Sequence, residues 1–409
     1  MEILNNIILL LVLLIGIFIY KKYSYRSPYF IIYAVYFIYL YSVHLDFLFF
    51  NFSSVLLDRN VDIEFSSLTF TIINLLSFSF FAGYFLNLKF NDDKYKIIEI
   101  SYLKILYKPL FYLLLIIFIA YNLNEIITNF GYTRTDLKGN VSLGSMLFNN
   151  FQRYFFLIIF ASRIKTSKLF NIYALSFILM GILTFEREPI IVFFIAFLFK
   201  TKKRKKIFLP ILLSIALLFI IANFKSFYIN VLYSSGRGFD SFIESFRNTN
   251  FSLSGLDPKM SYIIFYDSIS VYFDQFSEYR FSYITGIFNQ IYRFVFESDY
   301  QTLAEYSSKI YTNNDFGTAF SFMVESILNF WFIGPFILGF VLTNVLKYSI
   351  KISHIYGNGI IAAVIFVLMK FSRTELSTII KLQILPLIFT LILFNIFLKK
   401  DDKHMHTHI

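Results

Sequence analysis

The sequence predicts an all-α, polytopic membrane protein with about 11 (10–12) transmembrane helices and one large extracytoplasmic loop. Three observations lead to this fold class. The 409 residues are 57% hydrophobic with a mean hydropathy of +0.64, which leaves too little polar surface for a soluble protein of this size. The apolar residues gather in separate runs, most of them near the ~20 residues that cross a bilayer as a helix. The basic residues gather in every second connection between these runs.

Eleven apolar runs predict the spans and divide the chain into three regions. The first run lacks a basic n-region and a small-residue cleavage site, so we expect it to be a helix and not a cleaved signal. Residues 1–222 hold eight spans, 223–318 form the extracytoplasmic loop, and 319–409 hold three spans and a cytoplasmic tail. The spans are expected at 3–20, 28–50, 65–88, 106–124, 147–162, 169–185, 189–199, 207–222, 319–346, 357–371 and 381–398.

Six basic segments fall on one side of these spans. The positive-inside rule makes that side the cytoplasm, so we expect the N-terminus outside and the C-terminus inside. Membrane topology then accounts for much of the net charge of +11, and nucleic acid is not an expected partner. The segments are Lys21–Arg26, Lys89–Lys108, Arg163–Lys168, Lys200–Lys206, Lys347–Lys351 and Lys399–Lys403.

The predicted inner and outer segments differ in which basic residue they contain. Within the inner segments only Arg26, Arg163 and Arg204 are arginine. A guanidinium binds phosphate or carboxylate through two parallel hydrogen bonds and stays charged when desolvated, so the outer arginines predict an anionic ligand. The alternative is that they pair with outer Asp and Glu or extend to the interface. They are Arg59, Arg134, Arg153, Arg187, Arg237, Arg247, Arg280, Arg293 and Arg373.

Two outer constellations combine these arginines with acids. Glu186-Arg187-Glu188-Pro189 forms a short hairpin, in which Pro189 suits the first turn of the following helix. In the large loop, the four residues Arg237, Asp240, Glu244 and Arg247 fall on one helical face. Each constellation predicts an anion site, or otherwise a polar surface held by local ion pairs.

A polar stripe opens the ninth span. Thr318, Ser321, Glu325 and Asn329 follow at steps of three or four on an otherwise apolar helix. A carboxylate inside a membrane is costly and therefore a functional candidate, unless a structural arginine such as Arg153 pairs with it. In the large loop, apolar residues from Phe273 to Val295 recur at helical spacing, and this helix is expected to lie along the membrane or to cap a cavity.

The order of these features resembles the O-antigen or oligosaccharide repeat-unit polymerases, the Wzy-type family. The resemblance is carried by the outer hairpin FEREP, one large outer loop late in the chain, the following helix GTAFSFMVESILNFWFIG and the basic outer end LMKFSRTEL. It implies a GT-C-like glycosyltransferase in the bacterial cytoplasmic (inner) membrane. Such enzymes polymerise polyprenyl-pyrophosphate-linked oligosaccharides, with undecaprenyl pyrophosphate as the carrier, into O-antigen or capsule. A chain-length regulator and a flippase are the protein partners that it implies.

The resemblance also gives the candidate residues their roles. Glu325 is the first candidate for the general base and Glu186 the second, and arginines stabilise the leaving diphosphate without a metal or cofactor. Three alternatives stay open: an O-antigen ligase, a lipid-linked oligosaccharide flippase or other transporter, and a structural subunit. The residues expected to bind pyrophosphate or sugar are Arg134, Arg187, Arg237, Arg247, Arg280, Arg293, Asn329 and Arg373.

Overall fold

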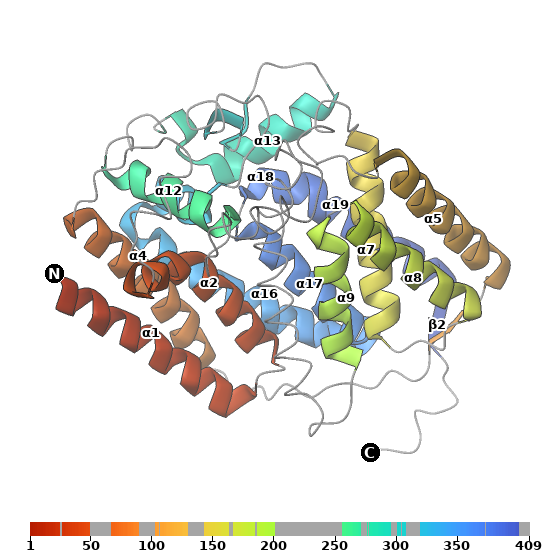
Figure 1. Cartoon of the computed structure of the whole chain (residues 1–409), viewed down its shortest axis with the longest axis horizontal. Helices are drawn as coiled ribbons and strands as arrows, with labels where there is room; N and C mark the ends of the chain where they lie inside the picture. Colours follow the sequence, from red (N-terminus) through yellow and green to blue (C-terminus); the bar gives the residue numbers. More distant parts are fainter. Residues whose placement is uncertain are drawn as a thin grey trace, which may run out of the picture. The chain divides into compact units, whose positions relative to one another are not determined.

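The computed structural model is mainly helical, and its helices group into two compact units (Figure 1). Unit 1 comprises Met1–Tyr95, Ile215–Lys347 and Leu368–Lys381, and unit 2 comprises Lys96–Ser214, Tyr348–Val367 and Leu382–Ile409. The structure describes residues 1–24, 27–49, 67–89, 103–105, 107–129, 143–162, 167–184, 186–200, 256–270, 276, 278–295, 301–303, 305–307, 320–372 and 374–400.

Unit 1 is built around the packing of the N-terminal helices with helices from later in the chain. α1 packs against α2 and α4, α12 packs against α2, α4 and α15, and α13 packs against α15 and α18. Its elements are α1 (Glu2–Tyr23), α2 (Pro28–Phe49), α4 (Ser67–Lys89), α12 (Leu256–Ser270), α13 (Ser282–Val295), α15 (Phe322–Phe330), η5 (Trp331–Ile333), most of α16 (Gly334–Tyr356) and α18 (Leu376–Ile379).

Glycines bring α4 and α16 into backbone contact. A Cβ atom on Gly83 would lie 2.1 Å from the Phe336 carbonyl oxygen, and one on Gly339 would lie 2.1 Å from that of Phe80. Neither contact leaves room for a side chain. Small residues at such positions allow close packing between helices in lipid, where the hydrophobic effect drives helices together only weakly.

Polar contacts in unit 1 join the helix ends that the predicted alternation places on the same side. At the ends predicted to face the cytoplasm, the Tyr23 hydroxyl donates to the Leu88 carbonyl at 3.1 Å, and Lys347 Nζ donates to the Asn87 carbonyl at 2.8 Å. At the opposite ends, Asn74 Nδ2 donates to Asn5 Oδ1 at 3.1 Å. Neighbouring helices therefore run in the directions that the basic segments require.

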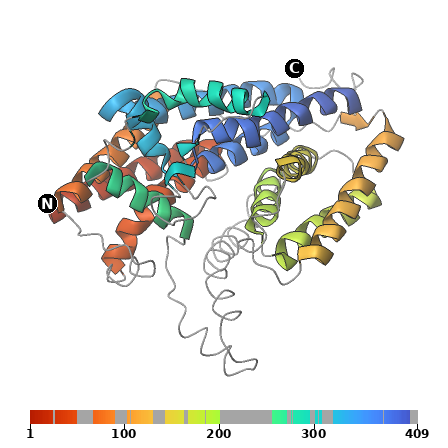
Figure 2. The ribbon, with the colours of Figure 1, turned by 90° about the horizontal axis from the view of Figure 1, so that it is seen from above.

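Unit 2 has α7 at its centre, packed against α9 and α19, while α5 packs against α8 (Figure 2). Stacked and edge-on aromatic rings fill the space between these helices, among them Phe118, Phe155, Phe156 and Tyr173. Its elements are β1 (Leu103–Ile105), α5 (Lys108–Asn129), α7 (Leu143–Ala161), α8 (Lys168–Leu183), α9 (Arg187–Lys200), the end of α16, most of α17 (Asn358–Phe371), the end of the π-helix η6 (Ile380–Ile384), α19 (Leu385–Phe397) and β2 (Leu398–Lys400).

A short two-stranded antiparallel ladder accompanies the helices of unit 2, while the fold remains helical as predicted. β1 pairs with β2 in the register Leu103↔Lys400, Lys104↔Lys399 and Ile105↔Leu398. β1 stands just before α5, and β2 directly follows α19. The ladder thus joins two of the basic segments that were predicted to lie on the same side.

The apolar runs are confirmed as helices wherever the structure describes them, and the run at 207–222 lies outside the described residues. Six described helices are long and apolar enough to cross a membrane, and α8 and α17 are shorter apolar helices. The chain is therefore a multi-pass helical membrane protein. The six are Glu2–Tyr23, Pro28–Leu45, Ser67–Lys89, Lys108–Thr128, Phe322–Ser353 and Leu376–Ile396.

The predicted ninth span is not one straight helix. It is broken at η5, and a Cβ atom on Gly334 would lie only 2.0 Å from the Ser326 carbonyl oxygen. Eight residues of a straight α-helix would separate these positions by about 12 Å, so α15 bends back on the start of α16. The 23 residues of α16 reach about 35 Å, enough to cross a bilayer without α15.

The described residues of the large loop include the helices α12 and α13. The pattern read from Phe273 predicted a helix, but α13 begins only at Ser282. Phe276 and residues 278–281 precede it, and residues 271–275 lie outside the described part.

Candidate functional site

Glu325 is buried in unit 1 and binds two other elements. Only 1% of the residue is exposed. Its Oε1 accepts a hydrogen bond from the Ser282 hydroxyl at 3.3 Å, and its Oε2 accepts one from the backbone N–H of Leu376 at 3.0 Å. Because Leu376 is the first residue of α18, the carboxylate of Glu325 caps that helix from outside it.

Asn329 lies one helical turn further along α15 and faces the same way. Its Nδ2 donates to the Ser282 hydroxyl at 2.9 Å and to the Glu325 carbonyl at 2.8 Å, while its Oδ1 accepts from the backbone N–H of Tyr283 at 2.9 Å. Asn329 therefore satisfies an N–H in the first turn of α13. The predicted polar stripe is confirmed for Glu325 and Asn329. We call Ser282, Tyr283, Glu325 and Asn329 the Glu325 cluster.

A second buried carboxylate stands beside this cluster. Glu375 directly precedes α18, is itself 1% exposed, and accepts a hydrogen bond from the Thr378 hydroxyl at 2.8 Å. Its neighbour Leu376 donates to Glu325, so two carboxylates meet at the start of one helix. The sequence shows that Glu375 follows the tenth span. That Glu325 lies beside it depends on how α15 and α18 pack in the tertiary structure.

A small pocket opens next to Asn329. Arg280 is exposed at its edge, with its guanidinium 5.5 Å from the centroid of the Trp331 ring, a cation–π contact. Phe281 and Trp331 have left-handed backbones, with φ of 63° and 57°. Such conformations cost about 1–3 kcal/mol each for residues other than glycine and tend to occur at functional sites. The lining residues are Arg280, Phe281, Ile327, Leu328, Asn329 and Trp331.

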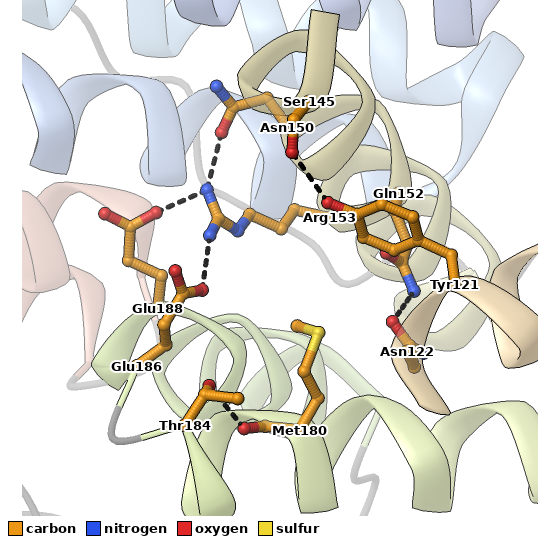
Figure 3. Close-up of polar contacts among 10 residues, drawn as sticks. All are labelled: Tyr121, Asn122, Ser145, Asn150, Gln152, Arg153, Met180, Thr184, Glu186 and Glu188. Carbon is orange, nitrogen blue, oxygen red and sulfur yellow. Dashed lines mark hydrogen bonds and ion pairs between the residues drawn. The ribbon is translucent and has the colours of Figure 1, made fainter. Parts of the chain in front are cut away.

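In unit 2 a buried arginine, Arg153 of α7, joins the two acids of the hairpin (Figure 3). The residue is 5% exposed. Its guanidinium donates to Glu186 Oε2 at 3.1 Å and to Asn150 Oδ1 at 2.7 Å, and it pairs with Glu188 Oε2. Glu186 lies between α8 and α9, and Glu188 lies in the first turn of α9. We call these four residues the Arg153 cluster.

The polar run of α7 extends this network to other helices. Asn150 Nδ2 donates to the Leu382 carbonyl of the π-helix η6 at 2.7 Å. Gln152 Nε2 donates to Asn122 Oδ1 of α5 at 2.7 Å, and Asn122 Nδ2 donates to the Ser176 hydroxyl of α8 at 3.1 Å. Lipid offers polar side chains no hydrogen-bond partners, so polar residues on neighbouring helices bond to one another. Through these bonds α7 holds α5, α8 and η6 together.

The structure changes the interpretation of the hairpin. The sequence predicted an anion site at Arg187, or otherwise a polar turn held by local ion pairs. The structure adds an arginine from another helix, because Arg153 pairs with both acids of the hairpin. Arg153 was also an alternative partner for Glu325; the partners described for Arg153 are Asn150, Glu186 and Glu188, all in unit 2. The sequence could have pointed to Arg153, because it is an ionisable residue inside a predicted span and has Asn149, Asn150 and Gln152 close by.

The other predicted site residues are less completely placed. Arg280 and Asn329 line the same pocket. Asn329 lies one turn of α15 away from Glu325. Arg187 begins α9 and Arg293 lies on α13, but their side chains lie outside the described part, as do all atoms of Asp240 and Glu244. The described residues contain no group of three His, Asp or Glu side chains that could hold a metal ion. Outside the described residues altogether are Arg134, Arg237, Arg247 and Arg373.

Comparison of the chain with protein-family models, with characterised proteins and with solved structures gives no significant match.

Proposed function

We propose that the protein is a membrane glycosyltransferase that polymerises polyprenyl-pyrophosphate-linked oligosaccharide repeat units at the outer face of the bacterial cytoplasmic membrane. The observation that carries the proposal is the pairing of a buried, hydroxyl-bound carboxylate, Glu325, with the neighbouring pocket of Arg280 and Trp331. The proposal includes eleven spans in a GT-C-like arrangement, with the N-terminus outside and the C-terminus in the cytoplasm.

The reaction moves one proton and one glycan. A hydroxyl of the incoming unit attacks the anomeric carbon of the growing chain, the bond from that carbon to the diphosphate breaks, and the hydroxyl proton passes to a base. In the proposal Glu325 is that base, and the support is that its carboxylate already accepts a hydrogen bond from a hydroxyl, that of Ser282. In the proposal the acceptor hydroxyl takes the place that Ser282 occupies here.

Arg280 is the proposed partner of the leaving diphosphate. It is exposed at the pocket and carries the guanidinium fork that suits phosphate oxygens. Positive charge fixed beside the bond that breaks stabilises the transition state in which negative charge develops on the diphosphate. Asn329 supplies an amide at the same pocket. Glu186, which binds Arg153, is assigned to holding the hairpin.

Transport of the lipid-linked oligosaccharide is the second candidate function. The observation in its favour is the break between α15 and α16, because transporters bind substrates at broken helices. Both functions place a lipid-linked anionic sugar near the Glu325 cluster, but they differ in the product that accumulates when the protein is lost.

Deletion of the gene should leave single repeat units on the lipid carrier or on the surface acceptor, with no ladder of longer chains. The reason is that export and attachment continue while chain elongation stops. Gel electrophoresis of the surface polysaccharide measures this. Complete loss of surface sugar, with units trapped on the inner leaflet, would instead identify a transporter.

Replacing Arg280 by lysine should lower the polymerisation rate although the charge is kept. A charge-assisted hydrogen bond is worth about 1.5–3 kcal/mol, and its loss in the transition state slows a reaction roughly tenfold to a hundredfold. Initial rates with purified lipid-linked substrate measure the effect. Arg204→Lys is the matched control, because that arginine lies in a predicted cytoplasmic segment and should serve only topology. An Arg280→Lys variant with normal rate and abundance would remove the diphosphate contact from the proposal.

A further inference from the structure

The amphipathic helix α13 turns its apolar stripe away from the protein. Ile284, Phe288 and Tyr292 follow at steps of four, within about 80° of one another around the helix, and all three are more than half exposed. The buried side of α13 carries Ser282 and Gly286 instead. That side, formed by small or polar residues, faces the protein, where Ser282 bonds to α15. A helix capping a cavity would have the opposite arrangement, so the structure decides against that expectation.

The stripe continues into the corner where α15 meets α16. Phe330, Trp331, Phe332 and Ile333 are four consecutive exposed apolar residues, and Trp331 is 64% exposed. Phe281, which directly precedes α13 and is also exposed, lines the same pocket as Trp331 and so connects the corner with the stripe. We call these residues the α13–corner surface: Phe281, Ile284, Phe288, Tyr292, Phe330, Trp331, Phe332 and Ile333.

Three features of this surface favour lipid as its partner. The corner leads directly into α16, which belongs to a helix long and apolar enough to cross a membrane, so the surface continues a lipid-facing wall. α13 has 14 residues, about 21 Å, too short to span. Aromatic residues with a neighbouring arginine, as Arg280 stands over Trp331, are typical of the interface between acyl chains and headgroups.

We infer that α13 lies in the plane of the membrane, with the α13–corner surface buried among lipid acyl chains. It is an interfacial helix and not part of an aqueous loop. The Glu325 cluster then lies directly behind a membrane-embedded helix, and Arg280 stands at the level of the headgroups. This inference does not rest on the proposed glycosyltransferase activity.

The chain contains a single tryptophan, Trp331, which makes a direct test possible without a label. The protein is reconstituted in vesicles of ordinary or dibrominated phosphatidylcholine, and tryptophan emission is measured with and without aqueous iodide. Bromine quenches only from within the acyl region, so we expect brominated lipid to reduce the emission strongly and iodide to reduce it weakly. Stronger quenching by iodide than by brominated lipid would overturn the inference for the corner.

Two further variants test α13 itself. In a Trp331→Phe background, tryptophan is placed at Phe288, on the stripe, or at the adjacent Asn289, about 100° away around the helix and half-buried. We expect brominated lipid to quench Phe288→Trp more than Asn289→Trp, and iodide to show the reverse order. Equal quenching at both positions, or stronger iodide quenching at Phe288→Trp, would contradict an interfacial α13.

Discussion

Replacement of Arg153 by methionine should sharply reduce the amount of folded protein in the membrane. The guanidinium lies between Glu186 and Glu188, and its residue is only 5% exposed. Its removal leaves two carboxylates beside apolar helices without their counter-charge. Breaking a buried ion pair from one side costs about 3–5 kcal/mol, a large part of the 5–15 kcal/mol or so that stabilises a typical folded domain. Immunoblots of membrane fractions and thermal unfolding in detergent measure the loss.

A triple variant separates charge from packing. Adding Glu186→Gln and Glu188→Gln to Arg153→Met removes the orphaned charges, so we expect much of the lost protein to return. Arg153→Lys keeps the charge but replaces the guanidinium fork by a single ammonium, and should fall between the wild type and Arg153→Met. If Arg153→Met alone were as abundant and as heat-stable as the wild type, the Arg153 cluster would have no role in holding unit 2 together.

Replacement of Glu325 by glutamine should abolish detectable polymer while leaving the protein folded. The amide side chain would keep the shape and one carbonyl oxygen to accept the Leu376 N–H, but it cannot take up a proton. General-base catalysis contributes about 10²–10⁴-fold to a rate, so elongation should fall below what a gel of surface polysaccharide detects. The rate with purified lipid-linked substrate and the thermal stability are measured on the same preparation.

Ser282→Ala is the matched control for this prediction. It removes the hydroxyl that bonds to Glu325 but keeps the carboxylate, so we expect a small change in rate and at most about 1–2 kcal/mol in stability. If Glu325→Gln polymerised normally, the carboxylate would be only a cap for α18, and the proposed base would be wrong. If instead Glu325→Gln lost abundance while its remaining protein kept a normal specific rate, the role would again be structural.

The helices of this chain could be predicted from its sequence because a bilayer leaves few alternatives. Lipid offers no hydrogen-bond partner to the backbone, so an apolar run of sufficient length must be a helix. Basic residues resist crossing, so their spacing predicts which helix ends share a side. The contacts from Tyr23 to Leu88, and from Lys347 to Asn87, follow that prediction within unit 1.

The breaks within those helices were decided by tertiary packing. Nothing in the residue type of Trp331 indicates a left-handed backbone, which glycine adopts far more readily. The corner exists because α15 bends back on α16, with Gly334 against the Ser326 carbonyl. Hydropathy averages over some 20 residues, so such a corner stays hidden inside one apolar run.

The site shows the same division. The spacing of Glu325 and Asn329 determined that both side chains share one face of α15, because positions four apart on a helix always do. The tertiary structure decided which elements contact that face. They are α13, through Ser282, and α18, through Leu376. For Glu186 a local ion pair within the hairpin was only the alternative interpretation, and the structure shows Arg153 binding it from 33 residues away. A desolvated carboxylate needs a counter-charge, and in a bundle the neighbouring helix supplies it as readily as the adjacent residue does.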